Sequence, residues 1–513
     1  MARLWSSGAE LNSVIKEFSS ASTFNGMSVQ SAIARSGAYA ISAGLSLPTQ
    51  RGFVVGELSA TETTGPFFSR SYVYINASPD GEQSILAFLL SSLVVYITVD
   101  ASNVIRLYDE DGQIGSASPA LSSQRWYRVE MKVDASGAGG SHVAELKIDG
   151  AVYASSSTRN FSTGVSRFTV GHNLNSEGKT GSFYFDDIAV NNNSGAQQNS
   201  YPGGGKIIHL RPDDAGDVNE WQKSDGSAGS LTNYTQVDEI APDDATTLVR
   251  SSTLNDDDFY SLGGSGLSAS DTINVVQIGL RYSADVASST PTIKAQVKKA
   301  SGGTIAQGDA ITPNSTSWKT NNNVSALGYA LTAHLDPDGV AWTNTTLDSM
   351  QAGMSVTTDN TNIVRVTTVW ALVDYTESGG NTTTSSSTTS TTSSSSTSTS
   401  TSSSTTTSSS TTTQAGATTT SSTTTTSSTS SSTSTSTSTS TSSSTTSSST
   451  TTQAGPTTTS STTTSSTSTS TSSSTTSSSS TTTQGQSTTT PELEVKPIIP
   501  ILEVRRTYKP HDV

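Results

Sequence analysis

Short runs of alternating apolar and polar residues, separated by Gly, Ser, Asn and Asp, make up the first 196 residues. Residues 127–133 alternate in this way, and so do residues 144–148, which end at Asp149 and Gly150, a pair typical of a tight hairpin turn. Further strand-like runs lie at residues 72–75, 85–90, 93–99 and 104–108. Because no helical period of useful length occurs, the pattern predicts antiparallel β-strands.

The same kind of pattern returns after a polar, Gly-rich segment at residues 197–205, with strand-like runs at 273–282, 292–298 and 364–373. We therefore predict an all-β chain with two antiparallel β-sandwich (jelly-roll) domains, at residues 1–196 and 206–377, joined by a linker at 197–205.

Residues 378–490 are almost entirely Ser and Thr. Such a tract cannot bury enough apolar surface to offset the entropy of ordering, so we predict a disordered stalk. Apolar residues return at 491–513. Two interpretations stay open for this C-terminal peptide: a functionless terminus, or an extended anchor strand that adds to the edge of another sheet.

The net charge of -15 lies on the residues before the stalk, because the acidic and basic residues of the C-terminal peptide balance. An acidic surface without a basic cluster argues against nucleic acid and against an anionic membrane as partners. The chain has no cysteine, which excludes disulfides and thiolate metal sites. Residues 1–12 lack the apolar core of a signal peptide, and no run has the length of a membrane span.

Four segments in order, at residues 126–134, 146–150, 168–171 and 183–190, resemble a concanavalin A-like (laminin G-like) jelly roll, with residues 35–41 as an early strand. The resemblance covers about residues 1–195. Residues 1–12 also resemble the start of structural proteins of bacteriophage particles. Residues 237–249, 255–260, 336–343 and 347–353 resemble domains of tail and capsid-associated proteins, which implies a particle context more than an activity.

Some concanavalin A-like domains are hydrolases, which need paired carboxylates such as Glu-x-Asp-x-x-Glu on a strand. That motif is missing here, so we predict no catalytic residue and no enzyme. Several laminin G-like domains hold calcium, which leaves Asp186 and Asp187 as candidate ligands. Because adjacent side chains on a strand point to opposite faces, at most one of the two should join a given site. The other acidic groups are interpreted as turn or loop charges: Asp109, Glu110, Asp111, Asp213, Asp214, Asp217, Asp256, Asp257 and Asp258.

No two histidines have the spacing of zinc ligands, and we predict no cofactor. The histidines are His142, His172, His209, His334 and His511. Tryptophans are candidates for stacking on sugar rings: Trp126, Trp221, Trp318, Trp342 and Trp370. The strand patterns around Trp126 and Trp370 favour a core position instead, and Trp342 follows a turn and should anchor a loop.

These observations favour a non-catalytic appendage of a bacteriophage virion, assembled in the host cytoplasm and exposed on the particle. Its expected partners are capsid or tail proteins, host-surface glycans and further copies of the chain. The alternative is a bacterial cell-surface or secreted adhesin with a mucin-like stalk, against which stand the missing signal peptide and the missing wall anchor.

Overall fold

The computed structural model describes residues 3–18, 20–22, 27–45, 52–58, 65–89, 93–161, 165–172, 179–287, 291–320, 329–358 and 361–379. All of these residues belong to one compact unit. Almost all of the predicted stalk, and the whole C-terminal peptide with His511, lie outside the described residues.

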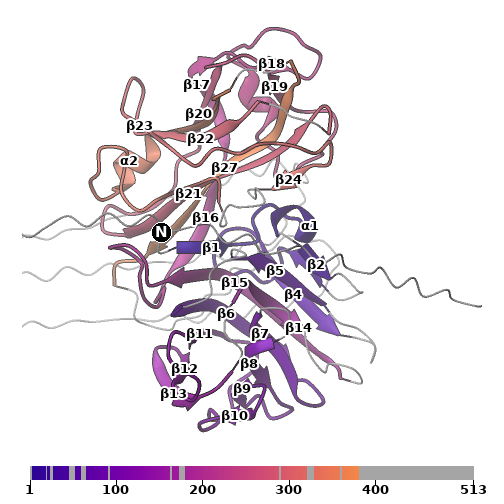
Figure 1. Cartoon of the computed structure of the whole chain (residues 1–513), viewed down its shortest axis with the longest axis vertical. Helices are drawn as coiled ribbons and strands as arrows, with labels where there is room; N and C mark the ends of the chain where they lie inside the picture. Colours follow the sequence, from indigo (N-terminus) through magenta and orange to yellow (C-terminus); the bar gives the residue numbers. More distant parts are fainter. Residues whose placement is uncertain are drawn as a thin grey trace, which may run out of the picture. The chain divides into compact units, whose positions relative to one another are not determined.

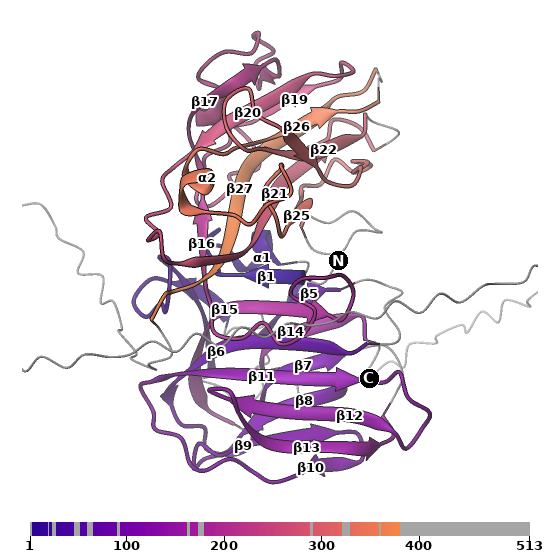
Figure 2. The same ribbon diagram turned by 90° about the vertical axis from the view of Figure 1, so that its left-hand side faces the viewer.

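Two antiparallel sheets take up the chain as far as residue 192 (Figures 1 and 2). Sheet A has eight strands in the order β13-β12-β11-β6-β15-β4-β3, with β1 also paired to β15. Their bounds are β1 Arg3–Ser7, β3 Met27–Gln30, β4 Ala40–Leu45, β6 Phe67–Ala77, β11 Trp126–Asp134, β12 His142–Ile148, β13 Ala151–Arg159 and β15 Gly181–Asn192. Sheet B has seven strands in the order β10-β9-β8-β7-β14-β5-β2. Their bounds are β2 Ser20–Ser22, β5 Gly52–Glu57, β7 Gln83–Leu89, β8 Leu93–Val99, β9 Ile105–Asp109, β10 Gly112–Ile114 and β14 Arg167–His172.

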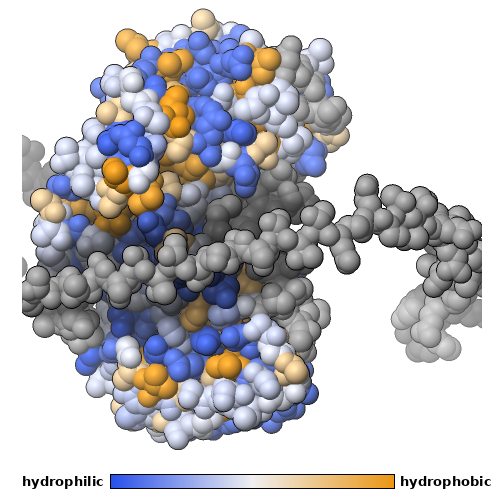
Figure 3. All heavy atoms as spheres, turned by 60° about the vertical axis from the view of Figure 1, so that its left-hand side comes forward, coloured by the Kyte–Doolittle hydropathy of each residue, from blue (hydrophilic) through white to orange (hydrophobic). Residues whose placement is uncertain are grey.

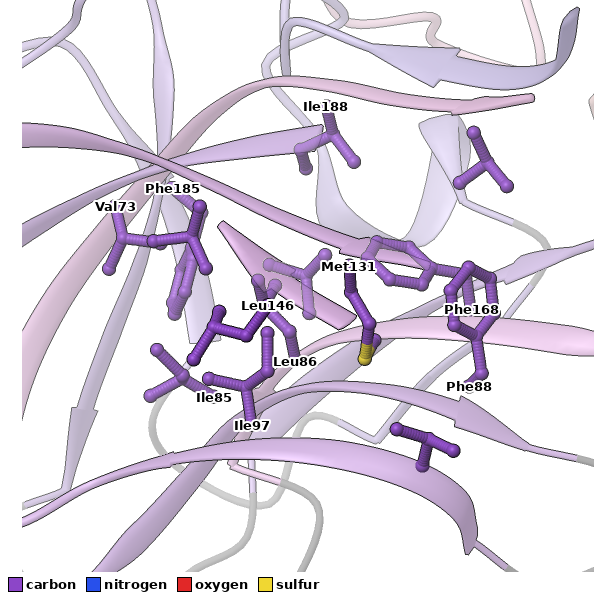
Figure 4. Close-up of a cluster of buried hydrophobic side chains, with 14 of the residues drawn as sticks. Val73, Ile85, Leu86, Phe88, Ile97, Met131, Leu146, Phe168, Phe185 and Ile188 are labelled. Atoms are coloured by element: carbon purple, nitrogen blue, oxygen red, sulfur yellow. The ribbon is translucent and has the colours of Figure 1, made fainter. Parts of the chain in front are cut away.

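A hydrophobic core lies between sheets A and B, because alternate side chains of both sheets point towards each other. Figure 4 shows part of this core, in which Met131 of sheet A lies near Phe88 and Phe168 of sheet B. The strand periodicity read from the sequence therefore has its expected consequence: one face of each strand is buried.

A second pair of sheets follows from residue 206 onward. Sheet C has seven strands, in the order β18-β19-β27-β21-β24, with β16 also on β27 and β25 on β21. Its bounds are β16 Lys206–Leu210, β18 Gln222–Lys223, β19 Val249–Ser251, β21 Thr272–Ala284, β24 Lys319–Thr320, β25 Leu331–Ala333 and β27 Val364–Thr376. Sheet D has five, in the order β17-β20-β26-β22-β23: β17 Pro212–Asn219, β20 Asp257–Leu262, β22 Ile293–Lys298, β23 Ile305–Gln307 and β26 Gln351–Val356. Their facing sides form a second core.

Helical structure is confined to α1 Val14–Glu17, α2 Asn344–Asp348 and the 3-10 turn η1 Asn233–Gln236 among the described residues. The prediction of a nearly all-β, antiparallel chain is thus confirmed. In the part of the chain that the structure describes, no helix is long and apolar enough to cross a membrane.

The hairpin predicted at Asp149 and Gly150 joins β12 to β13, and both residues have positive φ (50° and 88°) as a tight hairpin turn requires. The early strand predicted at residues 35–41 is partly wrong, since β4 begins only at Ala40. The preceding residues form a loop because the backbone N–H of Arg35 donates to the Asp186 carboxylate instead of a strand partner. The domain boundaries stay predictions.

Candidate ligand-binding face

The outer face of sheet A carries side chains in rows that run across its strands. Tyr127, Val129, Met131 and Val133 of β11 lie in the core, so the residues between them face outward. Strand register then aligns Trp126 with Tyr74 of β6, and Tyr74 with Tyr184 of β15. We call these three residues the aromatic row. Each neighbouring strand in this part of the sheet contributes one of them.

The rings of the aromatic row contact one another directly. The ring centroids of Tyr74 and Trp126 lie 5.3 Å apart, and those of Tyr74 and Tyr184 lie 5.8 Å apart, both in tilted geometry. Such aromatic pairs contribute about 0.5–1.5 kcal/mol beyond the area that they bury. Tyr184 stays half-buried while Trp126 and Tyr74 are buried, so the row is a packed but partly accessible surface.

Polar atoms of the aromatic row lack partners within the described residues. Trp126 Nε1 is buried and donates no hydrogen bond. No hydrogen bond of the described residues reaches the hydroxyl groups of Tyr74 and Tyr184. Burial raises the pKa of Tyr74, and the nearby Tyr184 adds to the rise. Trp126 Nε1 is therefore an unpaired buried donor, which is costly, while the two tyrosine hydroxyl groups are left open to solvent or to a ligand.

The next row towards the linker is dominated by charge. Arg128 of β11 aligns with Tyr72 of β6, and Tyr72 aligns with Asp186 of β15. The guanidinium of Arg35 lies 3.2 Å from the centroid of the Tyr72 ring. Arg35 Nη1 also donates to the carbonyl of Gly205 at 2.7 Å, so this cation is held from several sides.

Asp186 and Asp187 lie beside this row, and the expectation that their side chains point to opposite faces is wrong. A β-bulge interrupts the pairing of β15 with β6 after Asp186, and Asp187 has a positive φ of 49°. The bulge turns both carboxylates towards the loop before β4. Asp186 accepts from the backbone N–H of Arg35 (2.7 Å), and Asp187 forms an ion pair with Arg35 and accepts from the hydroxyl of Ser36.

Protein donors therefore occupy the two carboxylates that were candidate calcium ligands. Asp187 also accepts from the backbone N–H of Ile207 at 2.6 Å. Burial, with the neighbouring Asp187 and Glu10, raises the pKa of Asp186 well above its usual range. No group of three or more metal-ligating side chains occurs within the described ranges. The arrangement joins β15, the Arg35 loop and β16.

Other acidic candidates also have structural contacts. Asp109 is buried and forms an ion pair with Arg159. Asp217 lies in β17 and pairs with Lys298 at 3.0 Å. The interpretation of Asp258 as a solvated loop charge is wrong, because this residue lies in β20 and is fully buried. Its Oδ2 accepts from Asn233 Nδ2 (2.8 Å) and from the Tyr260 hydroxyl (3.0 Å), and burial raises its pKa to about 8.

The tryptophans take different positions. Trp370 and Trp221 are fully buried, and Trp342 is buried with its Nε1 donating to the carbonyl of Ala333 at 3.1 Å, as expected of a loop anchor. Trp318 lies against Arg365. Trp126 is buried as predicted, yet on the outer face of sheet A and not between the sheets. The sequence analysis did not identify Tyr74 and Tyr184 as candidate site residues. Only the register of three paired strands shows that they lie beside Trp126.

The described histidines are buried or half-buried and lie apart from the aromatic row. His142 contacts Phe161, His172 contacts Phe183, and His209 stacks on Trp370. Burial lowers the pKa of His172 and of His334 to about 4, and that of His209 well below its usual range.

Comparison with protein-family models and with curated proteins gave no match. Among solved structures, the chain is similar to "Cellulose induced protein, Cip1" (13% identity, 35% of this chain and 88% of that one, TM-score 0.27). It is also similar to a carbohydrate esterase, vb_24B_21, from Shiga toxin-encoding bacteriophage phi24B (17%, 37% and 99%, TM-score 0.28). A third is carbohydrate binding module CBM66 from Bacillus subtilis (12%, 34% and 98%, TM-score 0.24). With TM-scores this low, the likenesses carry no argument about what this chain does.

Proposed function

We propose that this chain is a non-catalytic glycan-binding protein that uses the aromatic row on the outer face of sheet A. The observation that carries the proposal is the combination of three packed aromatic rings with two tyrosine hydroxyl groups that bond to no described residue. Sugars offer both an apolar ring face and hydroxyl groups, so they match such a surface. An apolar peptide would leave the same donors unsatisfied.

The composition of the surface supports a polar ligand. Figure 3 shows hydrophilic and hydrophobic residues mixed over the uncovered part of the side in view, without one large hydrophobic area. Large apolar patches mark many protein-docking surfaces. The acidic residues that were considered for catalysis or calcium are instead committed to contacts with Arg35, Arg159, Lys298 and Asn233.

The experiment that tests glycan binding removes single polar atoms and keeps the rings. Full-length protein and the variants Tyr74→Phe and Tyr184→Phe are offered an array of bacterial surface polysaccharides and oligosaccharides. Each variant should weaken the observed binding about three- to tenfold, the effect of one lost hydrogen bond. Tyr108→Phe, on sheet B, is the matched control and should bind like the wild type. Failure of the wild type to bind any glycan would refute the proposal.

For the biological setting we propose a virion appendage, with the adhesin as the second candidate. The support is the resemblance of residues 1–12, 237–249 and 336–343 to phage particle proteins, together with the Ser/Thr-rich tract and the apolar C-terminal peptide. Cells that produce the protein are lysed, and the lysate is fractionated on a density gradient. An antibody against residues 1–379 then detects the protein in the fractions. Co-sedimentation with DNA-containing particles supports the virion. Recovery only with the cell envelope supports the adhesin and contradicts the virion.

A further inference from the structure

Residues 198–205 lie within the predicted linker. They cover the part of sheet A's outer face that the aromatic row does not occupy, around Phe68 and Glu130. The Tyr201 ring contacts Phe68 of β6 edge-on, with 5.0 Å between centroids. Its hydroxyl donates to Glu145 Oε1 of β12 at 2.9 Å, and the ammonium of Lys147 lies 3.7 Å from its ring centroid. One linker side chain thus spans the surface above β6 and β12.

The linker backbone is held at several points. Asn191 Nδ2 donates to the carbonyl of Ser200 (2.8 Å), and the N–H of Gly203 donates to Glu130 Oε1 (3.1 Å). Thr376 Oγ1 of β27 donates to the carbonyl of Gly204 at 2.8 Å. The carbonyl of Gly205 accepts from Arg35, as described above. Both pairs of sheets therefore hold the segment.

Glycine permits this close approach. A Cβ atom at Gly204 would lie 2.8 Å from Arg128 Nη1, and one at Gly205 would lie 2.3 Å from Arg70 Nη1. Gly203 has a φ of +68°, which side chains disfavour. Glu130 and Arg70 lie buried beneath the linker, and Glu130 accepts from the N–H of Gly203. Because the Tyr201 ring and several backbone groups of the linker are held at once, the linker acts as a wall and not as a lid.

The wall limits the space beside the aromatic row. Arg70 and Glu130 form the row that the linker covers, four residues along their strands from Tyr74 and Trp126. That separation amounts to about 13 Å at a strand rise of about 3.3 Å per residue. A polymer that follows the strands across the whole sheet would collide with the linker, whereas a chain end or a short oligosaccharide would fit.

We infer that the linker closes the binding face at this end and that the site selects glycan termini or short oligosaccharides over internal segments of long polymers. Tyr201 is a positioning residue, because its ring and hydroxyl group hold the linker on β6 and β12. This inference rests on the proposed glycan-binding function.

The test compares ligand lengths in the full-length protein, with chitotriose against chitohexaose and isomaltotriose against dextran as probes. The wild type should bind the short and long member of a recognised pair within about twofold of each other. Tyr201→Ala should bind the longer member at least about threefold more tightly than the wild type does, because the linker loses the ring that holds it against Phe68 and Lys147. Tyr201→Phe keeps the ring and should bind both lengths about equally, like the wild type. Tyr108→Ala, the control on sheet B, should do the same. Steadily rising wild-type affinity with length, or no effect of Tyr201→Ala, overturns the inference.

A second measurement needs no variant. Hydrogen exchange on the wild type should show the Gly203 amide protected, and unchanged when a bound trisaccharide is added. Faster exchange on binding would identify a displaceable lid and overturn the fixed wall. Absence of binding to every probe, or binding that Tyr184→Phe leaves unchanged, refutes the proposed function itself. Normal site binding whose affinity rises with ligand length in the wild type refutes the wall alone.

Discussion

Arg3 donates a hydrogen bond through Nη1 to Oδ2 of Asp374 at 2.6 Å, across 371 positions of sequence, and neither side chain is exposed to solvent. Arg70 Nη2 donates to the same oxygen at 3.1 Å, and Asn274 Nδ2 donates to Oδ1 at 3.0 Å. One carboxylate of sheet C therefore binds two strands of sheet A. Burial alone would raise the pKa of Asp374, but the charges of Arg70 and Arg3 outweigh it and lower the pKa.

Replacing Asp374 by Asn should destabilise the protein by about 3–5 kcal/mol, because two buried guanidinium groups would lose their counter-charge. Urea unfolding followed by tryptophan fluorescence measures the loss. Glu57→Gln is the control: Glu57 pairs with Arg167 at 3.4 Å, and both side chains are nearly half exposed. Its loss should stay within about 1 kcal/mol. Equal losses in the two variants would show that the buried pairing contributes little.

Gly279 of β21 is packed directly beneath a tryptophan. A Cβ atom at this position would lie 2.2 Å from Cε2 of Trp370, whose side chain is fully buried. Gly279→Ala should therefore cost about 1–3 kcal/mol through overpacking, measured as a lower midpoint of urea unfolding. Gly264→Ala is the matched control, since nothing lies within 4 Å of its added Cβ. A midpoint for Gly279→Ala equal to that of the control would contradict the close contact.

The strands could be read from the sequence because their signal is local. Alternation at residues 127–133 needs only neighbouring residues to identify one buried face, and β11 Trp126–Asp134 has that face in the core. The turn at Asp149 and Gly150 is local in the same way. The bulge after Asp186 was not predictable from the sequence. An extra residue in a strand changes which side chains share a face, but it does not change the amino-acid composition of the strand in a recognisable way.

The candidate site depended on pairing between distant segments. Trp126, Tyr74 and Tyr184 lie on three strands, and only their register places them in one row. The strand pattern placed Trp126 in the core, because it predicts burial and not which face is buried. The contacts of Tyr201 with Phe68 and Glu145 are likewise non-local, so a Gly-rich segment that reads as a connector gave no sign of them.

Asp258 should make the protein less stable as pH rises from about 4 to about 8. Its folded pKa of about 8 lies above the usual value of 3.8, so the folded state holds a proton that the unfolded state has lost. Its contribution is complete below pH 3.8 and decreases as pH rises to about 8, by up to about 1.4 kcal/mol per unit. Asp258→Asn cannot titrate. The free energy of unfolding of the wild type should exceed that of Asp258→Asn by the largest amount near pH 4. This difference in free energy should become smaller towards pH 8. A constant gap would mean that the carboxyl group is ionised in the fold.

His172 should have the opposite effect and make the protein less stable as pH falls. Burial lowers its pKa to about 4, from an ordinary value of 6.5, so between these values the unfolded state binds a proton that the folded state does not. Its contribution is complete above pH 6.5 and decreases as pH falls to about 4, by about 3 kcal/mol in all. His172→Gln can still donate a hydrogen bond to the carbonyl of Ser84, and His172→Phe keeps a ring against Phe183; neither titrates. Denaturant unfolding from pH 7 to pH 4.5 should show the wild-type advantage over both variants shrinking by the same amount, because the loss belongs to the imidazole and not to packing. If the advantage stays constant over this range, the pKa of His172 is the same in the folded and the unfolded protein, and its burial does not control acid stability.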